Sequence, residues 1–201
     1  MYNKLVSIDN LFACWHEFKR GKIKKLDVLI FERNLEDNIF ALHETLQSQT
    51  YRHGSYATFH INDPKPRLIS KATVRDRLVQ HAVFAELYRL FDPIFIYHSY
   101  SSRLGKGTHL AVSNLAKALR QVSRNYIAPA FALKCDIKKF FHNLSHPKLL
   151  QLIQRRTKDK QCLWLIEEVI ASFASTPLGG GSIKKGVPIG NLTSQIFANI
   201  Y

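Results

Sequence analysis

The chain has 201 residues, of which 46% are hydrophobic, and its 29 lysines and arginines outnumber 15 aspartates and glutamates for a net charge of +14. This size and hydrophobic content suffice for one domain, or two closely packed lobes, without disulfides or structural metals. The positive charge favours a polyanionic partner such as a nucleic acid, although a basic surface that binds nothing has the same composition.

Cysteine spacing and the N-terminal sequence exclude several classes of protein. Cys14, Cys135 and Cys162 are far apart and lack the CxxC spacing of zinc sites, so we expect reduced core residues in a cytoplasmic protein. The first ten residues lack a secretory signal pattern, and no apolar run approaches the roughly 18 residues that span a bilayer. Export and membrane insertion are therefore not expected.

The N-terminal third of the chain predicts two helices and a hairpin. Residues 7–49 carry apolar side chains at three- and four-residue steps, interrupted at Gly21. The lysines and arginines at this break form either a solvated turn or a first contact with a nucleic-acid backbone. Residues 51–59 alternate aromatic and polar side chains, and the turn signal NDPKPR leads into a return strand at 67–69.

The middle of the chain predicts two more helices, a basic loop and a strand. Residues 73–90 form an amphipathic pattern that Asp92 and Pro93 end. The basic segment SYSSRLGKGTH precedes a second helix at 110–122. An apolar tract at 128–133 is typical of a buried strand that leads to Asp136.

The C-terminal part is predicted to be helical around one flexible loop. Ser145, ahead of Pro147, predicts the N-cap of a helix that continues to Arg155. Residues 161–173 form a further helix, and the loop LGGGSIKKG leads into the last one. No internal repeat or low-complexity linker indicates a domain boundary.

Asp136 is the main candidate for chemistry. A carboxylate at the end of a strand can hold a divalent cation, as two-metal phosphoryl transfer requires, but it is also a common helix cap or turn former. Asp63, Asp76 and Asp92 have no spacing that pairs them with Asp136, and a lone carboxylate cannot hold two magnesium ions.

Two glycine-containing loops are candidates for binding phosphate or a base pair. In residues 186–195, glycines precede an apolar helix, where backbone amides favour an anion, although a plain loop with an N-cap has the same pattern. The loop 99–109 is basic but lacks the spacing of a nucleotide-binding P-loop.

Five segments occur in an order and at spacings that resemble reverse transcriptases of the bacterial type: KPRLI, VRDRLVQHAV, SYSSRLGKGTHLAV, ALKCDIKKFF and GVPIGNLTSQIFANIY. The resemblance covers residues 65–201 and includes group II intron and diversity-generating retroelement enzymes. It implies an α+β right-hand polymerase fold with helix-rich fingers and a partial palm that contains an antiparallel sheet. The implied domains are an N-terminal extension at 1–64, fingers at 65–127 and a truncated palm at 128–201, with the thumb absent.

The resemblance also implies roles for individual residues. Asp136 matches the first catalytic aspartate, with the backbone carbonyl of Ile137 joining it at the metal. Phe141 matches the aromatic residue that excludes a 2′-hydroxyl, and Arg67 matches the arginine that grips the triphosphate, with Lys65 as a helper. The second pair of aspartates, in a YxDD-type turn, is expected beyond Tyr201, so the chain resembles an enzyme truncated before that motif.

The other implied positions lie along the nucleotide and the template. Ile189 and Gly190 match the loop at the incoming nucleotide and nascent base pair, and nucleic-acid contacts are implied for Arg75, Arg77, Arg103, Lys106, Ser194 and Gln195. Most reverse transcriptases read QGxxxSP where this chain reads IGxxxSQ, a form that resembles diversity-generating retroelement enzymes. Losing the amide at Ile189 is expected to weaken discrimination between nucleotides.

The predicted function is therefore RNA-directed DNA polymerisation, in which two Mg²⁺ ions assist transfer from a dNTP to a DNA 3′ end on an RNA template. The diversity-generating subtype implies errors opposite template adenines and a small basic accessory protein as partner. A group II intron-type enzyme and a non-catalytic RNA-binding module are the alternatives, and a fragment unable to fold alone is a third. The isolated 201-residue chain is expected to be inactive.

Overall fold

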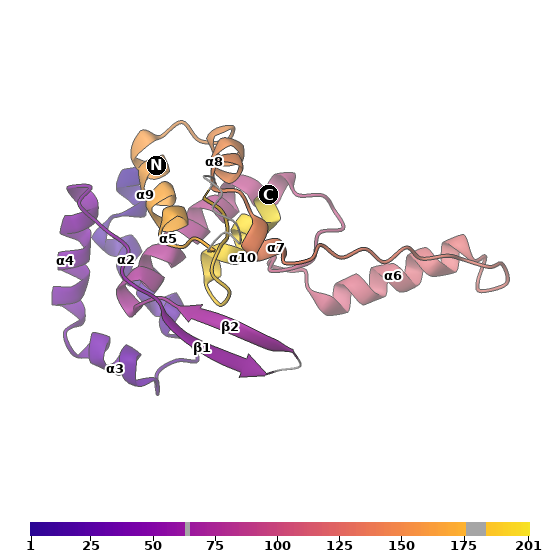
Figure 1. Ribbon diagram of the computed structural model, residues 1–201, viewed down its shortest axis with the longest axis horizontal. Helices are drawn as coiled ribbons and strands as arrows, with labels where there is room; N and C mark the ends of the chain where they lie inside the picture. The colour runs from indigo at the N-terminus through magenta and orange to yellow at the C-terminus, as the bar shows by residue number, and fades with distance from the viewer. Residues whose placement is uncertain (63–64, 176–183) are drawn as a thin grey trace.

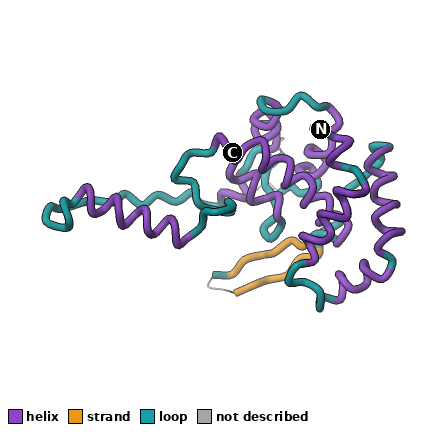
Figure 2. The backbone as a smooth tube through the Cα atoms, turned by 180° about the vertical axis from the view of Figure 1, so that it is seen from behind, coloured by secondary structure: helices purple, strands orange, loops and turns teal. Residues whose placement is uncertain are grey.

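The computed structural model of the protein describes residues 1–62, 65–175 and 184–201 (Figure 1). A two-stranded antiparallel sheet stands beside a larger set of helices, which is the α+β organisation that the sequence predicts (Figure 2). The elements in chain order are α1 Tyr2–Leu5, α2 Ile8–Lys19, α3 Leu26–Arg33, α4 Leu35–Gln47, β1 Ala57–Asn62, β2 Pro66–Lys71, α5 Val74–Phe91, η1 Asp92–Ile94, α6 Thr108–Val122, α7 Phe140–Asn143, α8 His146–Gln154, α9 Lys160–Ala171 and α10 Leu192–Ile200.

Helix α5 forms the centre of the core. Its side chains Leu78, Val79, Val83 and Leu87 are completely buried. Helix α2 from the N-terminal part of the chain and helix α10 from the C-terminal part both pack against it. Burying one such side chain contributes about 1.5–3 kcal/mol. The amphipathic periodicity predicted this helix, and it ends at Phe91, immediately before Asp92 and Pro93, as predicted.

Local capping explains where α5 begins. The hydroxyl of Thr73 accepts a hydrogen bond from the backbone N–H of Asp76 at 3.2 Å and donates one to the Asp76 carboxylate at 2.7 Å. The first bond is an N-cap, and the second holds the Asp76 carboxylate against the capping hydroxyl, where a capping box would instead use the backbone N–H of the cap residue. Ser145 occupies the predicted N-cap position of α8, although its side chain makes no capping hydrogen bond within the described residues.

The β-hairpin is shorter at its start than the sequence predicts. β1 pairs with β2 so that Phe59 lies opposite Ile69, and the turn residues 63–64 lie outside the described residues. Residues 51–56 are not a strand, because their backbone and side chains bind Asp76 and helix α9 instead. The strand predicted at 51–59 therefore begins only at Ala57.

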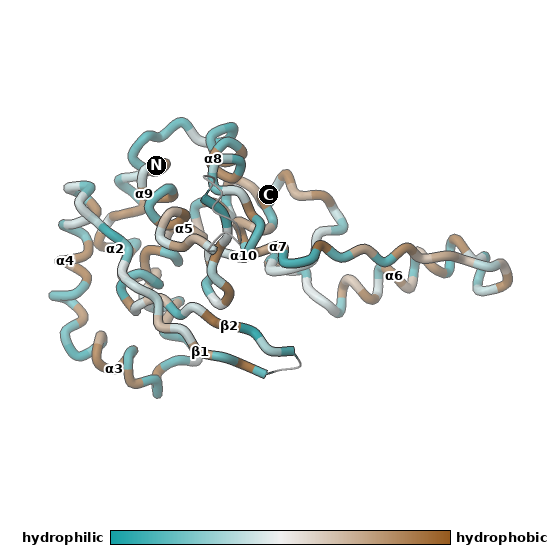
Figure 3. The backbone as a smooth tube through the Cα atoms, viewed as in Figure 1, coloured by the Kyte–Doolittle hydropathy of each residue, from teal (hydrophilic) through white to brown (hydrophobic). Residues whose placement is uncertain are grey.

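The predicted buried strand at 128–133 is wrong. Helix α6 and the segment that returns from it form an arm that extends away from the rest of the chain (Figure 1). Hydrophobic residues occur along this arm (Figure 3), where Phe131 is 96% and Leu133 is 91% exposed. A strand needs a neighbour to bind its N–H and C=O groups, and no described segment pairs with this one.

The arm also corrects the expectation for the cysteines. Cys14 and Cys162 are buried thiols, and burial is the main cause that raises their pKa values to about 11 and about 12. Cys135, which follows the exposed tract, is itself exposed.

In the described part of the chain, no helix is long and apolar enough to cross a membrane.

Candidate nucleic-acid interface

The segment 184–191 is bound to the residues that follow Asp136. The N–H of Val187 donates to the carbonyl of Phe141 at 2.9 Å, and the N–H of Gly186 donates to the carbonyl of Leu144 at 2.8 Å. Of the glycine-rich loop predicted at 178–186, residues 178–183 lie outside the described residues. These two bonds place the predicted sugar-sensing Phe141 beside the predicted nucleotide loop.

The same loop docks on the edge of β2 that faces away from β1. The N–H of Ser70 donates to the carbonyl of Ile189 at 3.0 Å, and Asn191 Nδ2 donates to the carbonyl of Ser70 at 2.6 Å. Gly190 approaches so closely that a Cβ there would lie 2.7 Å from Ile69 Cγ2, and its φ is +105°. Only glycine fits this position without strain. The loop 184–191 thus connects strand β2 with the segment that follows Asp136.

The two faces of the hairpin border different pockets. Alternation along β2 places Arg67, Ile69 and Lys71 on one face, and Leu68 and Ser70 on the other. Ile69 and Lys71 line a pocket of about 530 Å³ against α2 and α5. Leu68 and Ser70 line a pocket of about 340 Å³ together with His142, Val187 and Ile189. Arg67 and Ile189 are predicted to bind the same nucleotide. Arg67, however, lies on one face of the hairpin, and Ile189 lines the pocket on the other face.

Asp136 lies on the exposed segment between the arm and α7. The adjacent Ile137 is 68% exposed, and within the described ranges no group of three or more His, Cys, Asp or Glu residues could hold a metal ion. A carboxylate and a carbonyl are suitable magnesium ligands, but Mg²⁺ demands near-octahedral oxygen coordination. The donor set present here does not by itself fit two ions.

Arg75 and Arg77 both make contacts within the protein. The Arg75 guanidinium binds the carbonyl of Arg52 and lies 5.0 Å from the ring centre of Tyr51. Arg77 pairs with Asp27, and its side chain is 17% exposed. Their predicted contacts with nucleic acid stay predictions, and Arg77 would have to make them from the edge of a pocket.

Arg103 fastens the basic loop that precedes α6. Its Nε donates to Asp92 Oδ1 at 2.7 Å, and this hydrogen bond is the main cause that lowers the pKa of Asp92. The Arg103 side chain is 7% exposed, so little of its guanidinium is free for a ligand. Lys106 lies 4.3 Å from the ring centre of Tyr97. Arg103 thus stabilises the loop. Lys106 packs on Tyr97, and its contact with nucleic acid stays a prediction.

The start of α10 holds two loops in place. Ser194 is completely buried, and its hydroxyl donates to the carbonyl of Pro188 at 2.6 Å. Gln195 Oε1 accepts a hydrogen bond from the Ser102 hydroxyl at 3.0 Å. The structure therefore shows Ser194 as a residue that positions the glycine loop, and Gln195 as a link to the basic loop.

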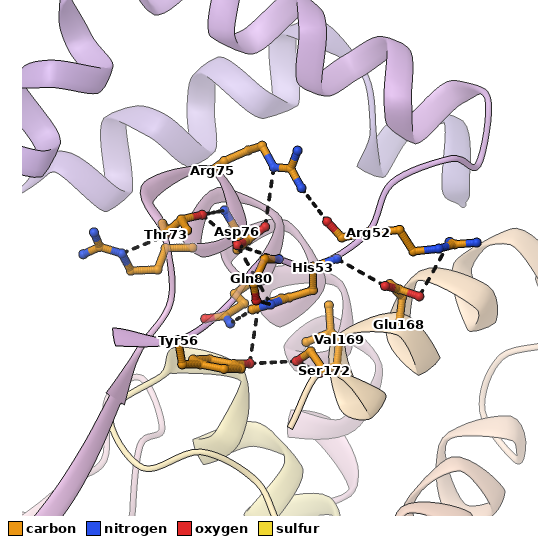
Figure 4. Close-up of polar contacts among 12 residues, drawn as sticks. Arg52, His53, Tyr56, Thr73, Arg75, Asp76, Gln80, Glu168, Val169 and Ser172 are labelled. Carbon is orange, nitrogen blue, oxygen red and sulfur yellow. Dashed lines mark hydrogen bonds and ion pairs between the residues drawn. The ribbon is translucent and has the colours of Figure 1, made fainter. Parts of the chain in front are cut away.

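Sequence reasoning missed a buried polar network beneath the hairpin (Figure 4). The carboxylate of Asp76 is fully buried and accepts hydrogen bonds from Tyr51 Oη at 2.8 Å, the N–H of Gly54 at 3.1 Å and Thr73 Oγ1 at 2.7 Å. Tyr56 extends the network by pairing its hydroxyl with Ser172 on α9. In the sequence, Asp76 is only an acid without a spacing that pairs it with Asp136, because its long-range partners are invisible there.

The comparisons with known proteins agree with this arrangement. The family model described as "Reverse transcriptase (RNA-dependent DNA polymerase)" matches residues 59–201, well over half of the chain. The chain belongs to the reverse transcriptase family. This reverse transcriptase chain is 27% identical over 169 residues to the group II intron-encoded protein LtrA of Lactococcus lactis, covering 83% of the chain and 27% of LtrA.

Other relatives extend the comparison. An uncharacterized 91 kDa protein in the cob intron of Schizosaccharomyces pombe is 29% identical over 135 residues, covering 67% of this chain and 16% of that protein. A solved partial Cas6-RT-Cas1–Cas2 complex has a chain similar in fold, with a TM-score of 0.51 and 19% identity over 99% of this chain and 33% of that one. The predicted polymerase fold and the resemblance to bacterial and retroelement reverse transcriptases are confirmed. The chain spans only about a sixth to a quarter of these two curated relatives.

Proposed function

We propose that this chain provides the fingers and part of the palm of an RNA-directed DNA polymerase, which adds deoxynucleotides to a DNA 3′ end on an RNA template. One observation carries the proposal: the loop 184–191 binds both Ser70 of the hairpin and Phe141 of the palm segment. Motifs that are more than 100 residues apart are thereby joined around a basic hairpin. The family match to residues 59–201 supports this assignment.

The proposed division of labour follows the sequence motifs. Residues 65–127 form the fingers, 128–201 belong to the palm, and 1–64 are an N-terminal extension. Asp136 and the Ile137 carbonyl contribute to a magnesium site whose other ligands must come from outside the described residues. The exposed position of Asp136 leaves its carboxylate accessible to such ligands.

Primer extension tests the proposal. The assay uses an RNA template, a DNA primer, dNTPs and Mg²⁺, and compares the 201-residue chain with the product of the full reading frame that contains it. Removing a supporting residue of a metal site typically costs 10–100-fold, so Asp136→Asn should cost more than about 100-fold. Asp92→Asn, which changes an acid paired with Arg103, is the matched control. Equal activity of the Asp136 variant and wild type would refute the assignment.

The subtype of polymerase has two candidates. The IGxxxSQ sequence at Ile189 supports the diversity-generating type, with a small basic accessory protein, while the similarity to LtrA supports a group II intron type. Sequencing the cDNA distinguishes them, since errors concentrated opposite template adenines are expected for the first type. A uniform error spectrum would support the second.

A non-catalytic RNA-binding module is the competing function. It is favoured by the net charge of +14 and by the lack, among the described residues, of a group of three or more His, Cys, Asp or Glu residues that could hold a metal ion. Such a module would bind RNA with steep salt dependence, and neither Mg²⁺ nor Asp136→Asn would change its affinity. Failure of primer extension combined with this binding pattern would establish the module.

A further inference from the structure

A buried histidine at the start of helix α8 holds the loop 184–191. His146 is 4% exposed, and its Nε2 lies 2.6 Å from the carbonyl oxygen of Gly186. Because a carbonyl oxygen only accepts hydrogen bonds, Nε2 is the ring nitrogen that carries the proton. Burial is the main cause that lowers the pKa of His146, so the ring is held in its neutral form with this tautomer.

The backbone around His146 pairs with the same loop. The N–H of His146 donates to the carbonyl of Lys184 at 3.1 Å. Ser145 and Lys185 form an isolated antiparallel bridge. On the other side, the N–H and the hydroxyl of Ser175 both donate to the carbonyl of Lys185, each at 2.9 Å. The first residues of the loop therefore lie between α8 and the segment that follows α9.

The peptide that His146 binds has little room to move. Gly186 has a φ of +99°, and a Cβ at this position would lie 2.5 Å from Ser175 Oγ. A left-handed φ and so close an approach both favour glycine. An added side chain would therefore displace the peptide whose carbonyl accepts the hydrogen bond from His146.

The loop is anchored at successive peptides by different elements. The carbonyls of Gly186, Pro188 and Ile189 accept hydrogen bonds from α8, α10 and β2, respectively. Between the first two anchors, the N–H of Val187 donates to the carbonyl of Phe141. Because each peptide unit is a rigid plane, a shift at one anchor is passed to the next peptide. Loss of the first anchor is therefore expected to move the loop relative to Phe141.

We propose that His146 is a positioning residue for polymerisation, because its Nε2–H holds Gly186 and thereby sets the place of the loop that receives the incoming dNTP. The inference rests on the proposed function, which assigns nucleotide binding to Ile189 and Gly190. His146 acts through the loop backbone, against which its ring is buried. Its loss should therefore weaken dNTP binding while leaving the chemistry at Asp136 in place.

Two substitutions separate the hydrogen bond of His146 from its volume. His146→Phe keeps a ring of similar size without a donor, whereas His146→Gln keeps an N–H donor. His43 on α4 provides the matched control, because its Nδ1 lies 2.8 Å from the carbonyl of Val6, away from the loop. His43→Phe therefore removes a similar contact between a histidine and a backbone carbonyl.

Primer extension by the longer protein gives the KM for dNTP and the kcat of each variant. His146→Phe should raise this KM about 10-fold, the loss expected when a buried carbonyl loses its donor, with kcat within about 3-fold of wild type. His146→Gln should keep KM within about 3-fold of wild type, and His43→Phe should leave it unchanged. An unchanged KM in His146→Phe, or an equal rise in the His43 variant, overturns the proposal, because destabilisation alone removes active enzyme without changing KM.

Hydrogen exchange in the 201-residue chain tests the position of the loop without any activity. The Ser70 amide donates to the loop, and the Val187 amide belongs to it. In His146→Phe, exchange of both should accelerate about 10-fold more than that of the Leu78 amide in α5. Equal acceleration at all three amides would indicate global destabilisation and overturn the proposal. Selective acceleration without polymerisation by the wild type refutes only the proposed function, whereas polymerisation without selective acceleration refutes only the role of His146.

Discussion

Removing the carboxylate of Asp76 should destabilise the fold more than any change at its exposed surface. Three donors bind this carboxylate, from Tyr51, Gly54 and Thr73, and they tie the segment before β1 to the first turn of α5. In Asp76→Ala, all three donors lose their acceptor in a site with no exposure of the side chain.

The hydrogen bonds that Asp76 accepts set the expected loss in the free energy of unfolding. A buried polar group left without a partner costs about 1–3 kcal/mol, and the hydroxyls of Tyr51 and Thr73 can rotate toward other acceptors. We therefore expect Asp76→Ala to lower the free energy of unfolding by about 3–5 kcal/mol. Asp76→Asn keeps the shape, and the Tyr51 hydroxyl can turn to accept from the new amide. Its loss should be only about 1–2 kcal/mol.

Urea unfolding followed by circular dichroism measures both variants. The midpoint should fall while the m-value stays unchanged, and the melting temperature should drop by about 2–4 °C for each kcal/mol. Arg89→Ala, on the exposed face of the same helix, should stay within about 0.5 kcal/mol of wild type. A loss below about 1 kcal/mol for Asp76→Ala would refute the view that this network fixes the segment before β1 to helix α5.

Gly190→Ala should lower the free energy of unfolding by about 1–3 kcal/mol, because its φ is +105° and the new Cβ meets Ile69. In Gly105→Ala, φ is +67° but the space is open, so urea unfolding should show a smaller loss and equal losses would contradict the close approach. His81 has a pKa lowered to about 4 in the folded chain, so the unfolded chain binds more protons between about pH 4 and its ordinary 6.5. Stability should therefore fall as the pH drops through this window, and urea titrations of His81→Gln should show a flatter profile than wild type.

Short-range patterns were sufficient for most helices and for the hairpin. The three- and four-residue periodicity located α5 because one side of that helix is apolar throughout, and Asp92 with Pro93 marked its end. The motifs around Arg67, Asp136 and Gly190 identified the family, since each depends on local sequence order. The roles of those residues in binding and catalysis stay predictions.

Features that depend on distant residues could not be read from the sequence. The tract at 128–133 has the composition of a buried strand, but a strand forms only beside a partner, and its side chains are exposed here. Residues 51–56 alternate like a strand, yet the buried carboxylate of Asp76 binds this segment from 20 residues and more away.

Sequence alone was enough for most of the longer helices, for the position of the hairpin and for the family, because periodicity and ordered motifs are local properties. Folding determines which basic residues lie close together. Lys22 and Arg77 are 55 positions apart, and only the packing of α2 on α5 brings them to the same aromatic ring. Composition revealed an excess of positive charge, but a site arises only where folding holds several charges at one cavity.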